Sequence, residues 1–236
     1  MNILAKALVS LTLVAGAAPA VAQEIVVTGS LLRSRGLVDV APSMPSVTMR
    51  RMADFAVQRV TLTGDTREAA RRRDEIYAMV RGAIDLQGKY GVELSTGTLV
   101  VEPLTIANYR DLPLEKDDDD RADTETTTFL VKTRLAPGMD AKAALDRITK
   151  FIAAVPSVGR AELKADGDMT LSVVKPEQYR GAIVDLIAAD SAANAAKFGA
   201  GYGVEVRGLD RPVEWARASL TEVFLYLPMS YTVRPK

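Results

Sequence analysis

Segments with the periodicity of amphipathic helices alternate along this chain with segments typical of β-strands, and this order limits the possible folds more than any other feature. Helices are expected at 65–91, 140–155 and 176–199, each between strand-like segments. Helices arranged in this way usually cover a sheet whose strands are mostly antiparallel. We therefore predict an α+β fold with helices packed on largely antiparallel sheets, built from repeated strand–helix–strand–strand units.

Polar residues and glycines mark the expected ends of these helices. Asp65 and Glu68 are spaced as a capping pair for the first helix, which is expected to end near Gly88 or Gly91. Asp140 is placed to cap the second helix with its side-chain oxygen. The third helix is rich in alanine, so another element could approach its backbone closely.

Two long segments are expected to be strands of a sheet. The segment 124–135, TETTTFLVKTRL, alternates along its length and is rich in β-branched residues, which favour a pleated strand. In 54–64, DFAVQRVTLTG, the apolar residues change parity near Gln58 and Arg59. Because a change of parity moves side chains to the other face, it predicts a bulge or bend at this point.

A hairpin is expected in the second half of the chain. Segments 158–163 and 169–174 read as short strands, and Asp166, Gly167 and Asp168 lie between them. An Asp-Gly step suits a tight hairpin turn. The two aspartates could also form a metal pair, but a turn accounts for them fully.

Residues 1–22 have the features of a secretory signal peptide. Lys6 precedes an apolar run at 7–15, and small residues ending at Ala22 place the expected cut before Gln23. The run is too short to span a bilayer, and no later segment has the length of a membrane helix. We expect export to a bacterial periplasm and no integral membrane segment after cleavage, and association with the outer membrane is left open.

Beyond the cut, we expect an N-terminal strand and irregular connection at 23–47 and an α+β region at 48–236. The stretch EIVVTG at 24–29 has two interpretations. It could be a strand of the domain, or an extended peptide that pairs with a TonB-like partner, as near the mature N-terminus of TonB-dependent transporters. The chain is too short to form a transporter barrel, so the domain strand is favoured.

Composition argues against several classes of function. Basic and acidic residues number 30 each, and this balance argues against nucleic-acid binding. The absence of histidine removes imidazole-based zinc sites and Ser-His-Asp catalysis, and the absence of cysteine removes disulfides. We expect a non-enzymatic protein with no catalytic residue, no cofactor and no metal ligand.

Acidic side chains gather between positions 115 and 125. Their oxygens could hold Ca²⁺, but the alternating ligands and central glycine of an EF-hand loop are absent. Consecutive like charges repel one another and favour a solvated loop. A surface loop is therefore the favoured interpretation, with calcium binding left open, for Glu115, Asp117, Asp118, Asp119, Asp120, Asp123 and Glu125.

Basic side chains gather in the first helix. Arg67 and the run 71–73 could bind phosphate or an anionic headgroup. Glu68 lies one turn before Arg72, so paired surface charge is the favoured interpretation.

Aromatic and serine residues of the last third are candidate site residues. Trp215, Tyr226 and Tyr231 could line a ligand groove or a subunit contact, although packing in the core or on an edge strand is favoured. Ser191 and Ser219 lack the surroundings of a catalytic nucleophile.

The order of these segments resembles the SIMPL family, formerly DUF541, of exported bacterial proteins. The resemblance covers about residues 24–233. It rests on the stretches EIVVTGS, FAVQRVTLTGDTREAARRRDEIYAMVRGAI, GVELSTGTLVVEPL, TTTFLVKTRL, PEQYRGAIVDLIAADSAANAAKFGAGYGVEV and VFLYLPMSYTV.

The resemblance implies a periplasmic or envelope-associated, non-enzymatic protein that forms ring-like homo-oligomers and has a role in stress tolerance. It transfers no catalytic residue. One alternative is a periplasmic adaptor whose EIVVTG segment pairs with a TonB-like partner. A less favoured alternative is a hydrolase of envelope polymers that uses two carboxylates.

Overall fold

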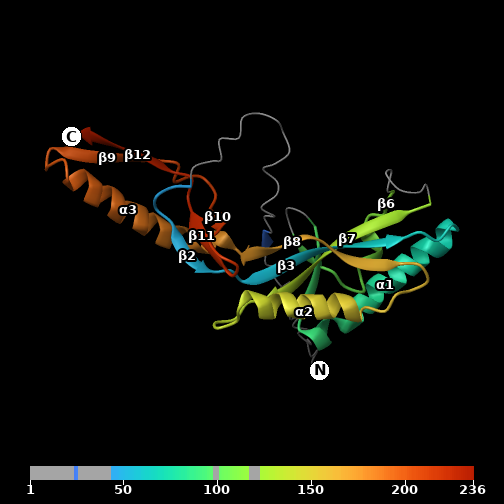
Figure 1. Ribbon diagram of the computed structural model, residues 1–236. Coiled ribbons are helices and arrows are strands. Elements are labelled where there is room, and N and C mark those ends of the chain that lie inside the picture. The colour runs from blue at the N-terminus through green and yellow to red at the C-terminus, as the bar shows by residue number, and fades with distance from the viewer. Residues whose placement is uncertain (1–23, 26–43, 98–100, 117–122) are drawn as a thin grey trace, which may run out of the picture.

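The computed structural model describes residues 24–25, 44–97, 101–116 and 123–236 (Figure 1). The predicted signal peptide, its cut between Ala22 and Gln23, and residues 26–29 of EIVVTG lie outside this part of the chain. The helices are α1 (Ala69–Tyr90), α2 (Ala141–Ala154) and α3 (Arg180–Ala196), with 3₁₀ turns at Tyr109–Asp111 and Pro176–Tyr179. The strands are β1 (Glu24–Ile25), β2 (Met49–Met52), β3 (Phe55–Gly64), β4 (Glu93–Thr96), β5 (Glu102–Pro103), β6 (Glu115–Lys116), β7 (Glu125–Arg134), β8 (Glu162–Val174), β9 (Tyr202–Arg207), β10 (Glu214–Arg217), β11 (Glu222–Tyr226) and β12 (Ser230–Pro235).

The largest sheet has the strand order β1-β8-β3-β7-β4-β5, with β6 beside β7, and every pairing in it is antiparallel. Its centre is built from two strand–helix–strand units, β3–α1–β4 and β7–α2–β8, whose strands interleave. This is the split β-α-β arrangement of ferredoxin-like folds. The predicted α+β class, with helices on largely antiparallel sheets, is confirmed.

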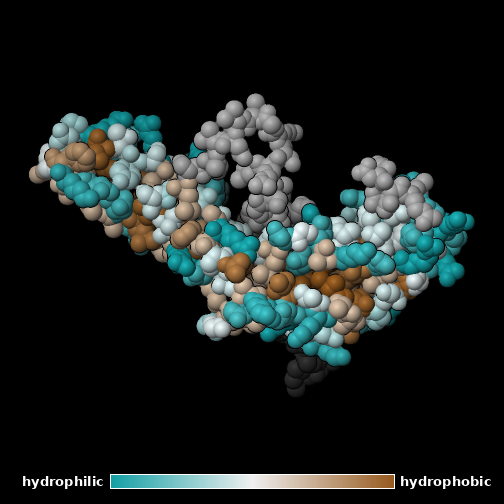
Figure 2. All heavy atoms as spheres, viewed as in Figure 1, coloured by the Kyte–Doolittle hydropathy of each residue, from teal (hydrophilic) through white to brown (hydrophobic). Residues whose placement is uncertain are grey.

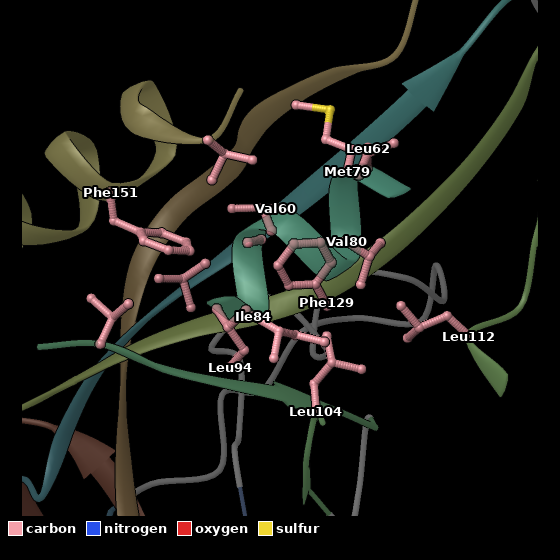
Figure 3. Packing of buried hydrophobic residues seen from close by; sticks show 14 of the residues in the cluster. Val60, Leu62, Met79, Val80, Ile84, Leu94, Leu104, Leu112, Phe129 and Phe151 are labelled. Atoms are coloured by element: carbon pink, nitrogen blue, oxygen red, sulfur yellow. The ribbon is translucent and has the colours of Figure 1, made fainter. Parts of the chain in front are cut away.

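The first hydrophobic core lies between this sheet and the helices α1 and α2, which cover the same face of it (Figures 1 and 3). Val60 on β3 and Phe129 on β7 lie opposite each other in the register and point into this core. They meet Met79, Val80 and Ile84 from α1 and Phe151 from α2 (Figure 3). Among the described residues, the helices α1 and α2 thus lie on one face of this sheet.

A second core joins the sheet to the C-terminal third of the chain. A three-stranded sheet, β10-β11-β2, places Val223 and Leu225 against Ile183 and Ile187 of α3. Leu171 and other residues near the end of β8 belong to the same cluster. A separate two-stranded ribbon, β9 with β12, lies along the rest of α3.

The structure corrects the predicted hairpin, and it places the irregularity expected near Gln58 and Arg59 on the partner strand β8, because β3 itself pairs with β7 in an unbroken register. Residues 162–174 form one continuous strand, β8, so Asp166-Gly167 is not a turn between two strands. The register between β3 and β8 shifts between Val57 and Arg59, where β8 carries extra residues. Gly167 has φ +68° there, and the buried Gln58 amide donates to the carbonyls of Asp166 and Gly167. The Asp-Gly step thus serves a β-bulge.

Helix ends agree with the prediction for α2 and at the end of α1, but they differ at the first cap and at α3. The helix α3 begins at Arg180 after the 3₁₀ turn Pro176–Tyr179, not at Pro176, and ends at Ala196. Glu68, not Asp65, is the N-cap of α1, because its carboxylate accepts from the backbone amides of Ala70 and Arg71. Gly91 ends α1 in the left-handed conformation, and Asp140 caps α2. None of the helices in the described residues has the length and apolarity needed to cross a membrane.

Candidate interaction surface

The helix α3 and the ribbon of β9 and β12 form an arm that projects from the central sheet (Figure 1). The register of the ribbon places Val204 opposite Val233 and Val206 opposite Tyr231. These four side chains share one face and are half-buried, whereas Glu205 and Arg207 of β9 alternate with them. The ribbon thus rests on α3 by a narrow apolar face, and its other face is polar.

A polar contact fixes the ribbon on α3. The Asn194 side-chain amide donates to the Tyr231 hydroxyl at 2.7 Å and to the Asp190 carboxylate at 3.1 Å. The Tyr231 hydroxyl donates to the same carboxylate at 3.4 Å. Tyr231 is therefore a positioning residue of the arm, in agreement with edge-strand packing and not with a ligand groove.

The opposite side of α3 carries an exposed apolar stripe. Ile183, Ile187, Ser191 and Ala195 are buried and recur at helical spacing on one side of the helix. The residues that recur on the other side are exposed and uncharged. They are Ala182, Leu186, Ala189, Ala193 and Ala196, and we refer to them as the α3 stripe. Surface helices of globular proteins normally bury their apolar side, so this stripe calls for a partner.

Two exposed aromatic side chains lie between the end of α3 and the start of β9. Phe198 is 61% exposed, and its ring centroid lies 5.9 Å from that of Tyr202, which is also exposed. Hydrophobic atoms are visible on the arm among hydrophilic ones in Figure 2. Phe198 and Tyr202 were not among the predicted site residues. The four-residue spacing of small apolar residues in the third helix is the signal that points to this surface.

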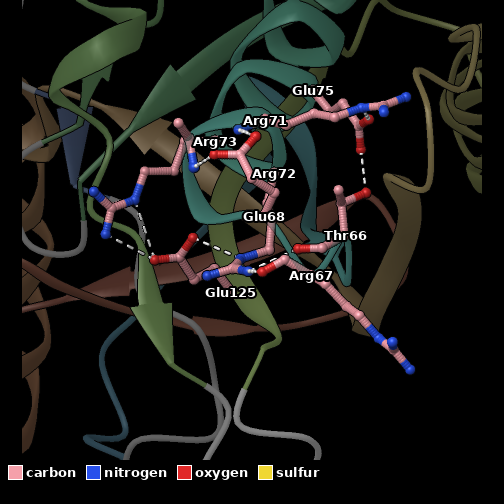
Figure 4. Close-up of polar contacts among 9 residues, drawn as sticks. Thr66, Arg67, Glu68, Arg71, Arg72, Arg73, Glu75 and Glu125 are labelled. Atoms are coloured by element: carbon pink, nitrogen blue, oxygen red, sulfur yellow. Dashed lines mark hydrogen bonds and ion pairs between the residues drawn. The ribbon is translucent and has the colours of Figure 1, made fainter.

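The predicted basic and acidic clusters meet in one ion-pair network (Figure 4). Arg72 and Glu125 are 5% and 2% exposed, and the Arg72 Nε lies 2.8 Å from a Glu125 oxygen. Arg73 donates to the other Glu125 oxygen at 3.0 Å, and Arg72 also donates to the Thr66 carbonyl at 2.7 Å. Burial raises the pKa of Glu125, but the hydrogen bonds from Arg73 and Arg72 outweigh it and hold that pKa below its ordinary value.

This network corrects two expectations. The partner of Arg72 is Glu125 on β7, not Glu68 one turn away, and Arg71 pairs with Glu75. Glu125 was expected in a solvated acidic loop, but both of its oxygens are occupied by guanidinium groups, so it is no candidate calcium ligand. The network ties the start of α1 to β7, which is a structural role.

The other acidic candidates are not gathered by the structure. Glu115 lies exposed on β6, and residues 117–122 lie outside the described chain. Asp166 pairs with Arg59 at 2.7 Å, beside the bulge. Within the described ranges, no three acidic side chains converge as metal ligands would.

The remaining candidates have structural surroundings. Trp215 lies opposite Leu225 and packs on the second core, whereas Tyr226 lies opposite Glu214 on the other face of that sheet. The Ser191 hydroxyl donates to a carbonyl one turn back in its own helix. The Ser219 hydroxyl accepts from two backbone amides in the turn before β11. These residues do not share a site.

Comparison with known proteins gives no family for this chain. No protein-family model and no curated protein matches it. Solved structures from Listeria innocua match weakly, among them two described as hydrolases and one described as an uncharacterized conserved protein. Their identities are 13%, 15% and 14%, and their TM-scores are 0.16, 0.16 and 0.17. The matches cover 78% of this chain and 91% or 92% of theirs. At these TM-scores, neither the description as a hydrolase nor the description as an uncharacterized conserved protein applies to this chain. The three matches do not test the resemblance to the SIMPL family.

Proposed function

We propose that this protein acts in the bacterial envelope without catalytic turnover, and that it works by self-assembly through the α3 stripe. The observation that carries the proposal is a helix covered on one side and left apolar on the other. The small residues of the stripe let a second backbone come close, and Leu186 supplies a larger apolar surface to bury. The predicted signal peptide supports the envelope location, and the SIMPL resemblance adds a role in stress tolerance.

A second copy of this chain is the partner that the charges favour. The stripe itself is uncharged, and the whole chain has a formal net charge of zero, so two copies approach without net repulsion. Asp185 lies near the start of α3 and Lys197 follows its end. When two α3 helices pack antiparallel, Asp185 of one copy and Lys197 of the other lie toward the same end of the contact, and the two helix dipoles point in opposite directions. Both arrangements are electrostatically favourable. Such a contact is isologous and yields a dimer, so a ring would need a second, different contact.

A charged side chain in the middle of the stripe is expected to abolish pairing. Ala189→Arg places a guanidinium where the two helices would touch, and its desolvation without a partner opposes association. In the chain from residue 23, measured by light scattering at micromolar concentration, we expect a multimer for the wild type and a single-chain mass for Ala189→Arg. The matched control is Ala188→Arg, because Ala188 is exposed on the same helix but lies outside the stripe.

Two outcomes would contradict the proposal. One is a wild-type chain that has the mass of one copy at every concentration tested. The other is an equal loss of mass in both arginine variants. Circular dichroism of each variant keeps a loss of folding apart from a loss of assembly.

A further inference from the structure

The ribbon of the arm has an edge that no described strand covers. Within the described ranges β12 pairs with β9 alone, and Figure 1 shows it along the margin of the arm. The backbone groups on the open side of an edge strand bind a further strand readily, so natural proteins usually protect such edges. The one proline of β12, Pro235, is its last residue, and the rest of the strand lacks this protection.

The hydrogen bonds of the ribbon show which backbone groups face this edge. The Lys236 amide donates to the Gly201 carbonyl at 2.8 Å, directly after the last pair of the ladder. Alternate residues of a strand point their backbone groups to the same side, so every second residue before Lys236 also faces β9. Tyr231 and Val233 therefore face outward, each with an N–H and a C=O. The place of Pro235 agrees, because the N–H that proline lacks would have pointed away from β9.

This outward edge is self-complementary. A second copy of β12 can lie antiparallel to the first with Thr232 opposite its own copy. Tyr231 of each copy is then opposite Val233 of the other. Both members of such a pair face the contact, so each pair exchanges two backbone hydrogen bonds. Every N–H and C=O that Tyr231 and Val233 offer on this edge is used.

The side chains of β12 suit the same register. On one face Tyr231 meets Val233, and on the other face Thr232 meets its copy. Aromatic with β-branched pairs and threonine pairs both stabilise neighbouring strands. Arg234 is the charged residue of β12 and lies opposite Ser230, so no like charges stand directly opposite each other across the contact.

We propose that the β12 edges of two copies join, so that their ribbons form one four-stranded sheet, and that this is the second contact of the assembly. The proposal rests on pairing through the α3 stripe, because so few hydrogen bonds do not hold two free chains together at micromolar concentration. A pair joined by the stripe presents two β12 edges. The ribbon and the stripe lie on opposite sides of α3, so both contacts form at once. Two different two-fold contacts link more than two copies, and in a closed ring each contact strengthens the others.

Cysteine cross-linking tests the β12 contact in this cysteine-free chain. Thr232→Cys places a thiol opposite its own copy, where the two Cα atoms of such a pair are about 4.5 Å apart, within the reach of a disulfide. We expect a disulfide-linked dimer under mild oxidation. The matched control is Ser230→Cys, which is also exposed on the same face but lies opposite Arg234, and it should cross-link at least tenfold less. The double variant Ala189→Cys with Thr232→Cys should give covalent products of three or more copies.

A proline on the outward edge gives an independent test. Val233→Pro removes an outward N–H and leaves the pairing with β9 in place, so it should lower the cross-linking of Thr232→Cys at least fivefold. In light scattering it should leave a mass of two copies. The matched control is Val204→Pro, because Val204 lies opposite Val233 in the ribbon and its N–H faces the other edge. It should behave as the wild type does.

The failure of this contact is distinct from a failure of the stripe. The β12 contact is overturned if Thr232→Cys does not cross-link while Ala189→Cys does. It is also overturned if Ser230→Cys cross-links as readily as Thr232→Cys, or if the two proline variants act alike while circular dichroism shows both folded. Absence of both the Ala189→Cys and the Thr232→Cys cross-links would overturn the stripe and the β12 contact together.

Discussion

Arg72→Met is expected to lower the free energy of unfolding by about 3 kcal/mol. The substitution leaves the buried Glu125 carboxylate without its closest buried cation and leaves the Thr66 carbonyl without a donor. Breaking a buried ion pair by removing one partner typically costs about 3–5 kcal/mol, and the lower figure applies because Arg73 still reaches Glu125. Urea denaturation followed by circular dichroism measures the change.

The neighbouring arginine provides the control. Arg73→Met removes a guanidinium that donates to the same carboxylate but is more than half exposed, so the loss of stability should be clearly smaller than for Arg72→Met. If both variants lowered the free energy of unfolding equally, burial would not determine how much each ion pair contributes to stability. A loss below about 1 kcal/mol for Arg72→Met would show that water replaces the guanidinium at Glu125.

Phe151→Ala is expected to lower the free energy of unfolding by about 3–5 kcal/mol. Phe151 is fully buried between α2 and the large sheet, and its ring packs edge-on against Tyr90 at 6.1 Å between centroids. Truncation removes apolar burial and leaves a cavity that the surrounding helices cannot fill. The matched control on the same helix is Leu145→Ala, because Leu145 is 43% exposed. Similar losses for the two variants in urea denaturation would contradict the position of the first core.

Local patterns predicted the strands and helices because their periodicity reflects burial on one face. The parity change at Gln58 has another cause, because β3 is regular: Phe55 and Val57 are buried on one face of the sheet, Val60 and Leu62 on the other. The bulge beside Gln58 lies on β8. Local patterns also failed at Asp166-Gly167. A glycine with positive φ serves a hairpin turn and a bulge equally well, and only the partner strand decides between them.

Contacts between distant residues were beyond the sequence patterns. Arg72 and Glu125 are 53 positions apart, so a rule for neighbours on one helix assigned Arg72 to Glu68 instead. The sequence showed that the third helix is rich in alanine. It did not show which side of that helix is exposed, because this depends on the side that the ribbon of β9 and β12 covers.

One cysteine in this cysteine-free chain gives the most direct test of self-assembly through α3. Ala189 lies at the middle of the stripe, so an antiparallel pair of α3 helices brings it next to its own copy. A disulfide forms only when the Cα atoms of the two cysteines are close together. Ala189→Cys should therefore form a disulfide-linked dimer under mild oxidation, and Ala188→Cys should not. Failure of Ala189→Cys to cross-link at concentrations where light scattering finds a multimer, or equal cross-linking of both variants, would contradict pairing through the stripe.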